Sequence, residues 1–159
     1  MVYFENLMGL IIFTGSLFLM LLTVPWHEIK RFAIFGAVGG LGMAIIFILI
    51  MQNWLDFWTF HRVDFLYLGK IPFFLSAAWT PTEIFFAHFL NQQKNTLRRF
   101  LIIVSIPAAA VVIHLILMWN DMLTYHHWNL FLTFLVSVGI HAGFAYYLNR
   151  IKFRCSLNL

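Results

Sequence analysis

The chain has 159 residues, of which 62% are hydrophobic and only 10% are charged. Soluble domains carry about 25% charged residues, so this composition excludes an ordinary soluble globule and a disordered chain, and it indicates an integral membrane protein. The single cysteine excludes an internal disulfide framework and a cysteine-based metal site. The net charge of +4 rests on ten basic residues that flank apolar runs, a pattern that favours membrane flanks over nucleic-acid binding.

Five apolar stretches are long enough to be membrane spans. A helix needs about 20 apolar residues to cross a hydrocarbon core of about 30 Å. The stretches are residues 7–24, 32–51, 71–90, 100–119 and 128–148. None alternates between polar and apolar residues as a transmembrane strand does, so each is predicted to be a helix. The sequence predicts an all-α polytopic membrane protein, in which residues 1–159 form a single five-helix transmembrane bundle.

The basic residues fall unevenly on the two sides of this bundle. One side holds only Arg62 and Lys70. The other side holds Lys30, Arg31, Lys94, Arg98, Arg99, Arg150, Lys152 and Arg154. Because basic residues near helix ends stay in the cytoplasm, we predict an N-terminus outside and a C-terminus inside. An outer aromatic belt is expected from Trp54, Trp58, Trp119 and Trp128.

Small residues recur at helical spacing in two of the predicted spans. Gly36, Gly40 and Ala44 share one face of the second span, and Gly139 and Gly143 repeat the spacing in the last one. Small residues four apart allow two helices to approach closely. Two interpretations stay open, namely packing within the chain and a homodimer face on the second span.

The third span contains the most informative residue, Glu83, because a charge near mid-bilayer costs at least about 2.5 kcal/mol. The preceding sequence resembles a helix start, with Thr80 as N-cap, Pro81 as the first helical residue and Glu83 as the capping-box partner. We therefore predict a third helix that is kinked or broken near Pro81. Glu83 then has two interpretations: it caps the broken helix, or it faces a wet cavity and binds a proton, a cation or an amine.

Depth in the membrane suggests a partner for Glu83. At about 1.5 Å per residue, Glu83 lies roughly 18 Å and His141 roughly 20 Å below the outer ends of their spans. His114 is shallower, and His88 lies nearer the cytoplasmic side. The sequence thus predicts an intramembrane polar site formed by Glu83 and His141, with His114 above it.

Metal and catalytic motifs are sparse. His126 and His127 are adjacent in an outer loop, but adjacent histidines are not a metal motif, and we predict no metal and no cofactor. The sequence has no phosphate-binding loop, zinc-protease motif or nucleophile elbow, so no catalytic residue is assigned. The expected partners are the lipid bilayer and either a second copy of the chain or another membrane protein, and not nucleic acid.

Two stretches resemble known families. The run LGKIPFFLSAAWTPTEIFFAHFL (residues 68–90) and the Trp128-Asn129-Leu130 start of the last span resemble a family of small, uncharacterised multi-pass membrane proteins of Gram-positive spore-forming bacteria. That resemblance implies a bacterial plasma membrane and no particular activity. Pro81-Thr82-Glu83 followed by two phenylalanines is similar to membrane-embedded lycopene cyclases, although Ile84 replaces their second acid.

Three functions are compatible with these features. We favour a non-enzymatic membrane component or partner subunit, for which Glu83 matters mainly in folding. The first alternative is a small proton-coupled transporter with Glu83 and His141 in a mid-membrane polar site. The second is a membrane enzyme acting on a lipid or isoprenoid, with Glu83 as general acid.

Overall fold

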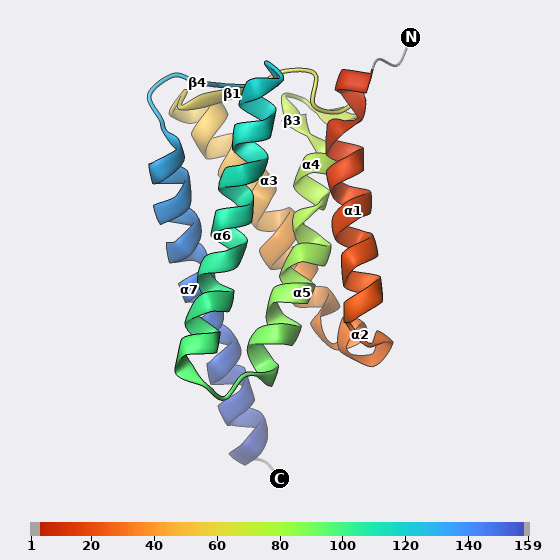
Figure 1. Cartoon of the computed structure of the whole chain (residues 1–159), viewed down its shortest axis with the longest axis vertical. Helices are drawn as coiled ribbons and strands as arrows, with labels where there is room; N and C mark the ends of the chain where they lie inside the picture. Colours follow the sequence, from red (N-terminus) through yellow and green to blue (C-terminus); the bar gives the residue numbers. More distant parts are fainter. Residues whose placement is uncertain (1–3, 158–159) are drawn as a thin grey trace.

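The structure is a computed structural model that describes the backbone of residues 4–157 and the side chains of residues 6–150. Helical rods run side by side along its long axis, the strands lie at one end, and α7 (Leu130–Leu157) ends at the other (Figure 1). Three helical segments are long and apolar enough to cross a membrane, which indicates a membrane protein. They are Trp26–Trp54, Thr96–Trp119 and Leu130–Arg150.

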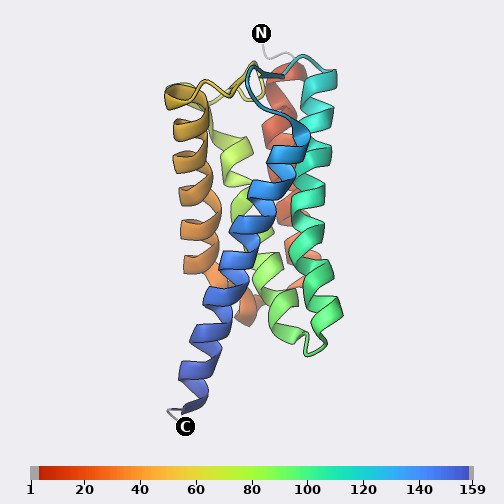
Figure 2. The same cartoon turned by 90° about the vertical axis from the view of Figure 1, so that its left-hand side faces the viewer.

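Five rods can be followed through the described residues (Figure 2). The first joins η1 (Phe4–Leu7) to α1 (Met8–Thr23), and the fourth and fifth are α6 (Thr96–Trp119) and α7. The third joins α4 (Phe73–Ala77) to α5 (Trp79–Gln92). The second runs through α2 (Trp26–Phe35), η2 (Gly36–Gly42), α3 (Met43–Ile48) and η3 (Leu49–Trp54), with π-helical turns in η2 and η3. The predicted helical class is therefore confirmed. Residues 26–31, which were expected to connect the first two spans, belong to helix α2.

The glycine-rich segment η2 packs against the third rod. A Cβ added at Gly40 would lie 2.6 Å from the backbone nitrogen of Thr80, and one added at Gly36 would lie 2.5 Å from the side chain of Ile84. These two glycines thus serve packing within the chain, one of the two interpretations that the sequence left open. Gly139 and Gly143 differ, because a Cβ at either position would meet no atom within 4 Å.

The third rod is interrupted at Ala78, between α4 and α5, and the predicted helix start at Thr80 is wrong. Thr80 lies inside α5, and the Ala78 position that precedes α5 makes no side-chain capping hydrogen bond. The Ala78 carbonyl instead accepts hydrogen bonds from the hydroxyls of Thr82, at 2.8 Å, and Ser16 of α1, at 3.2 Å. Pro81 has no N–H to donate to the carbonyl of Ala77, four residues earlier, and the two hydroxyls add side-chain hydrogen bonds at the adjacent carbonyl of Ala78.

The start of the third rod is capped from a distant loop by Asp64. Its Oδ2 accepts a hydrogen bond from the backbone N–H of Leu75, at 3.0 Å, in the first turn of α4. Burial raises the pKa of the Asp64 carboxyl above its usual value, against the opposing effect of the backbone hydrogen bonds. The same loop is joined to α1 by a hydrogen bond from Gly9 N to Val63 O, at 2.9 Å.

Two loops meet in a small antiparallel sheet that covers one end of the bundle. Strand β1 (Trp58–Phe60) pairs with β4 (Leu123–Tyr125), and Trp58 stands opposite Tyr125. The strands β2 (Tyr67–Leu68) and β3 (Ile71–Pro72) form a second short pair before α4. Trp58 is only 2% exposed, so its assignment to the aromatic belt is wrong, whereas Trp54 is 81% exposed as a belt residue would be.

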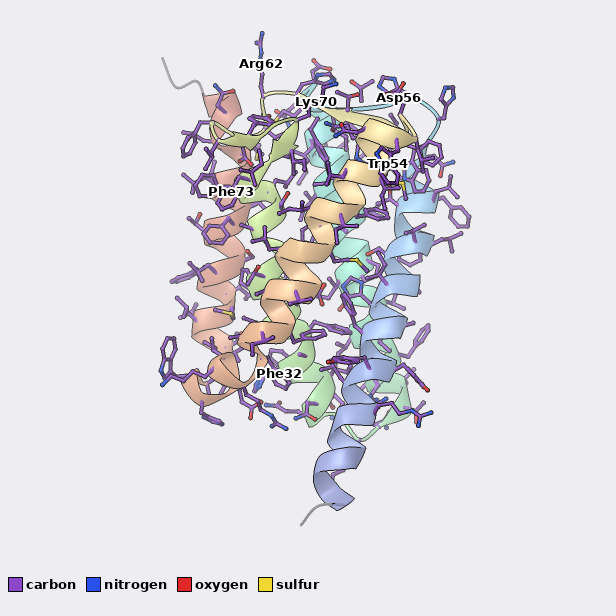
Figure 3. All side chains as sticks on the ribbon, turned by 180° about the vertical axis from the view of Figure 1, so that it is seen from behind. Phe32, Trp54, Asp56, Arg62, Lys70 and Phe73 are labelled. Atoms are coloured by element: carbon purple, nitrogen blue, oxygen red, sulfur yellow. The ribbon has the colours of Figure 1, made fainter. Side chains whose placement is uncertain are left out.

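The two ends of the bundle differ in charge. Arg62, Lys70 and Asp56 lie at the end that carries the strands, and Phe32 lies towards the opposite end (Figure 3). At that opposite end, Arg99 donates hydrogen bonds to the Leu90 carbonyl and to the Asn149 side chain. The connections that carry most of the basic residues therefore share one end of the bundle.

Candidate functional site

Glu83 and His141 lie together in the interior, at the level that the depth argument predicts. Nε2 of His141 is 3.1 Å from Oε1 of Glu83. Both residues are 2% exposed, and they come from α5 and α7, which are far apart in the sequence. The second carboxyl oxygen, Oε2, has no hydrogen-bond partner among the described residues. The predicted capping role of Glu83 is therefore wrong, because its carboxyl faces a histidine and not the start of α5.

The hydrogen bonds of His141 define the proton content of this pair. Nδ1 of His141 lies 2.7 Å from the backbone carbonyl of Ser137, and a carbonyl can only accept, so Nδ1 carries a hydrogen. In a neutral ring Nε2 is then an acceptor facing a carboxyl oxygen. A contact at 3.1 Å between them requires a further proton, carried by either Glu83 or His141. In both cases the pair has a net charge of zero, which explains how it is tolerated far from water.

The pair borders an apolar cavity of about 270 Å³ between the helices. Aromatic and aliphatic side chains form most of its wall, and the polar exceptions besides the pair are Thr82, His114, Thr133 and Ser137. The remaining wall includes Ala44, Phe47, Trp58, Phe60, Trp79, Ala110, Ile140 and Phe144. Of the predicted packing residues, Gly40 and Ala44 line this cavity, and the described side chains thus combine an apolar space with one buried carboxyl group.

Packed apolar clusters close the cavity towards both ends of the bundle. On the strand side, Trp58, Phe60 and Leu117 belong to one buried cluster. On the opposite side, Phe86 and Leu90 are 0% and 1% exposed and belong to another. Three of the residues that line the cavity are also exposed on the outer surface of the bundle. These are Leu19, Met43 and Ala109.

His114 lines the same cavity but belongs to a separate hydrogen-bond network near the sheet. Its Nδ1 bonds to the hydroxyl of Tyr125, which lies 2.8 Å from the hydroxyl of Thr133. The indole N–H of Trp128 donates to the same Thr133 oxygen, at 2.8 Å. His114 is thus tied to the covering sheet through Tyr125, and its position above the pair stays a prediction.

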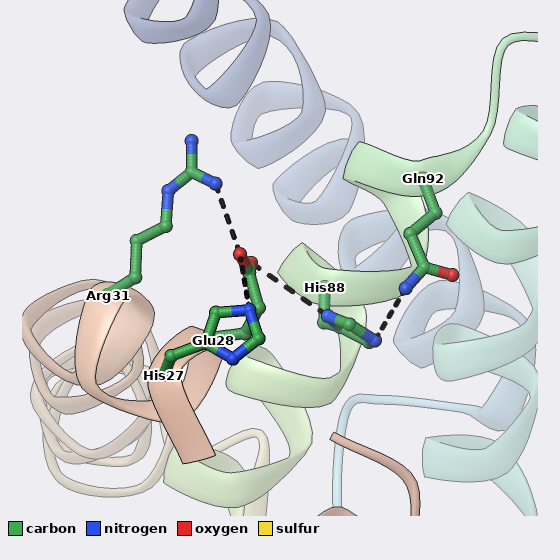
Figure 4. Close-up of polar contacts among 5 residues, drawn as sticks. All are labelled: His27, Glu28, Arg31, His88 and Gln92. Carbon is green, nitrogen blue, oxygen red and sulfur yellow. Dashed lines mark hydrogen bonds and ion pairs between the residues drawn. The ribbon is translucent and has the colours of Figure 1, made fainter. Parts of the chain in front are cut away.

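His88 lies outside the cavity, in a polar cluster at the opposite end of the bundle from the sheet (Figure 4). Its Nε2 is 2.8 Å from the side-chain nitrogen of Gln92, and its Nδ1 is 3.9 Å from Oε2 of Glu28. Glu28 also contacts Arg31, at 3.3 Å, and His27, at 3.7 Å. This cluster joins α2 to α5, and His88 is separate from the Glu83 site, as the sequence analysis expected.

Two histidines at the strand end of the bundle pair with threonines across the sheet. His61 Nε2 lies 3.1 Å from the Thr124 hydroxyl, and His126 Nε2 lies 3.0 Å from the Thr59 hydroxyl. Within the described residues, no three histidine, cysteine or acidic side chains are placed to hold a metal ion.

Sequence reasoning missed several residues of the site. Trp58 was assigned to the membrane interface, and Thr133 and Ser137 carry no motif that marks them. Ser137 lies four residues before His141, and positions i and i+4 share a helix face. This spacing is the sequence feature that could have indicated Ser137 as a neighbour of the site.

Comparisons of the chain with known protein families, with curated proteins and with solved structures find no match.

Proposed function

We propose that this chain is a five-span membrane protein that binds a lipophilic molecule in its interior cavity. The observation that carries the proposal is Glu83, which lines an apolar space of about 270 Å³ and whose buried Oε2 atom has no hydrogen-bond partner among the described residues. Buried polar atoms without a partner are rare and call for an explanation such as a ligand. A non-enzymatic binding role refines the membrane component favoured from the sequence.

All five rods are long enough to be spans. α1 and η1 together measure about 32 Å, from 16 α-helical and four 3₁₀ residues. The third rod, residues 73–92, measures about 30 Å. With most basic residues at the end opposite the sheet, the N-terminus is outside and the C-terminus inside. The resemblance of residues 68–90 to bacterial proteins points to a bacterial plasma membrane.

The size and access of the cavity favour a small lipophilic ligand. An apolar cavity of about 150 Å³ is enough for a benzene ring, so the larger space here suits a chain or ring of about ten carbons. The closed ends oppose a water-filled path, so the geometry gives less support to proton-coupled transport. Entry from the bilayer is supported by the exposed lining residues Leu19 and Met43.

A lipid- or isoprenoid-modifying enzyme is the second candidate, favoured by one observation. The Glu83–His141 pair holds a proton beside an apolar cavity, where it could act as a general acid. The Glu83→Gln variant separates the two functions. Binding alone survives this change, whereas proton donation to a substrate does not.

Photo-crosslinking in vesicles tests the binding function. The reconstituted protein is irradiated with a fatty alcohol of about ten carbons that carries a mid-chain diazirine, and labelled residues are mapped by mass spectrometry. We expect labelling of Phe47 and Ile140, which line the cavity from α3 and α7. Ala110→Phe, which fills the cavity, should remove most of this labelling.

A matched variant controls for changes at the surface of α6. Ala108→Phe adds the same side chain at an exposed position that does not line the cavity, and it should leave the labelling unchanged. Equal labelling of Phe47 in the wild type and in both variants would mean that the probe reaches it from the bilayer alone. That result would contradict the proposed function.

A further inference from the structure

We infer that the ligand bears a neutral hydrogen-bond donor, in the form of a hydroxyl group that binds Oε2 of Glu83. This inference rests on the proposed function and specifies the ligand class of the same site. The hydroxyl end would lie beside Glu83, and the hydrocarbon part would lie along the apolar wall formed by Phe47, Ile113 and Ile140.

The hydrogen-bond donor to Oε2 of Glu83 must come from the ligand. Nε2 of His141 has no hydrogen-bond partner among the described residues other than its 3.1 Å contact with Oε1 of Glu83, so we assign the proton of the pair to that contact. Oε2 is then an acceptor in either form, as the carbonyl oxygen of a protonated carboxyl or as one oxygen of a carboxylate. A group that only accepts, such as a ketone or an ether, gives Oε2 no hydrogen bond. A ligand that satisfies this atom must therefore supply an O–H or an N–H.

The neutral charge of the pair favours a ligand that is also neutral. The pair is neutral as a unit, so a cationic or anionic ligand would bring an unbalanced charge into an apolar cavity, at a large cost in desolvation free energy. A neutral hydroxyl adds no charge. The Ser137 hydroxyl lines the cavity one helical turn before His141, where it can donate to the ligand oxygen. An alcohol can thus both donate and accept at this end of the cavity.

The surroundings of the cavity favour entry of the ligand from the bilayer. The ends of the cavity are closed by Trp58 and Leu117 on one side and by Phe86 and Leu90 on the other. Met43, which lines the cavity from α3, is 37% exposed on the surface of the bundle. An alcohol dissolved in the bilayer can reach the pair by this lateral path, without crossing water.

A competition experiment with two compounds that differ in one O–H group tests this inference. A saturated fatty alcohol of about ten carbons and its methyl ether compete against the photoreactive alcohol for labelling of Phe47. Concentrations are expressed as mole fractions in the bilayer, so that different partitioning cancels. A hydrogen bond from the ligand to the pair predicts that the alcohol competes roughly tenfold better than the ether.

Two variants of the pair assign this preference to its carboxyl. Glu83→Gln keeps a carbonyl oxygen for the ligand while its amide nitrogen donates to His141, so the preference should persist. Glu83→Met combined with His141→Leu replaces both polar partners by apolar side chains, which avoids an unpaired buried group. In this double variant the alcohol and the ether should compete equally.

The outcomes separate the inference from the function on which it rests. Equal competition by the alcohol and the ether in the wild type, with labelling still sensitive to Ala110→Phe, would overturn the inference and leave the binding function standing. A tenfold preference that persists in the double variant would also overturn it. Absence of competition by either compound would overturn both the inference and the proposed function.

Discussion

Asp64 occupies an unusual position for a carboxyl group, since it is buried in a loop outside the membrane spans. Its Oδ2 caps α4 through Leu75 N, and its Oδ1 has no hydrogen-bond partner among the described side chains. An added Cβ at Gly9 would overlap this carboxyl group, so α1 approaches it closely only because residue 9 is glycine. One acidic side chain thus links the first rod to the start of the third.

The pKa of Asp64 predicts a pH dependence of stability. Burial raises the pKa of Asp64 in the folded state above that of the unfolded chain, so folding favours the protonated carboxyl. This contribution to stability is fully present below the unfolded pKa, near 4, and is lost as the pH rises through the folded pKa. We expect Asp64→Asn to remove this pH dependence, as measured by thermal unfolding in detergent across that range.

The control for this experiment is Asp56→Asn, in the same connection between the second and third rods but at an exposed position. Both asparagines keep a side-chain oxygen acceptor. A slope of stability against pH that is the same in the wild type and in Asp64→Asn would show that Asp64 is not the group responsible.

Sequence rules that apply within one helix predicted the common depth of Glu83 and His141. They did not predict the cap of the third rod, because a distant loop supplies it. The rise per residue placed Glu83 and His141 at one depth, because each lies on a single rod. The cap of the third rod was misassigned to Thr80, because the side chain that caps it is eleven residues upstream of Leu75 in a loop. No rule on helix starts extends to such a separation.

The contact between η2 and the third rod depends on two glycines. Gly40 faces the backbone of Trp79 and Thr80 next to the interruption at Ala78, and Gly36 faces Ile84 one turn further on. Larger side chains at either position would separate the second and third rods. This contact fixes α5, and with it Glu83, relative to the wall of the cavity.

A comparison of two glycine-to-alanine variants tests this packing. Gly40→Ala forces backbone atoms apart and should lower the free energy of unfolding by about 1–3 kcal/mol. Gly139→Ala adds a methyl group into open space, and it should leave the stability unchanged or raise it by up to about 1 kcal/mol, because alanine favours helix over glycine. Thermal unfolding in detergent compares the two, and similar values for both variants would contradict the packing account.

The cavity itself could not be predicted from the sequence, for reasons of geometry. Its wall combines side chains of several rods with Trp58 and Phe60 of the sheet. The sheet pairs residues 58–60 with residues 123–125, which are separated in the sequence by the third and fourth rods. Aromatic residues at the ends of apolar runs are typical of an interfacial belt, so no local pattern distinguished the buried Trp58 from the exposed Trp54.

Packed apolar clusters lie towards both ends of the bundle, and the proposed ligand enters from its side. The sheet and the cluster around Trp58 and Leu117 separate the cavity from one end, and Phe86 and Leu90 separate it from the other. In the proposed topology, these ends lie at the two faces of the membrane. The proposed function therefore predicts that a ligand at Glu83 enters from the lipid phase along a path without water.

Water access at Ser137 tests this account most directly. Ser137→Cys changes one atom in a cavity-lining side chain, in a background where Cys155 is replaced by serine, and Thr124→Cys marks the exposed face of the sheet. Intact cells and inverted vesicles are treated with a membrane-impermeant maleimide, and labelling after denaturation confirms that each thiol is present. We predict labelling at position 124 from outside and none at position 137 from either side before denaturation. Labelling at position 137 in the folded protein would show a water path to the pair and would contradict entry from the bilayer.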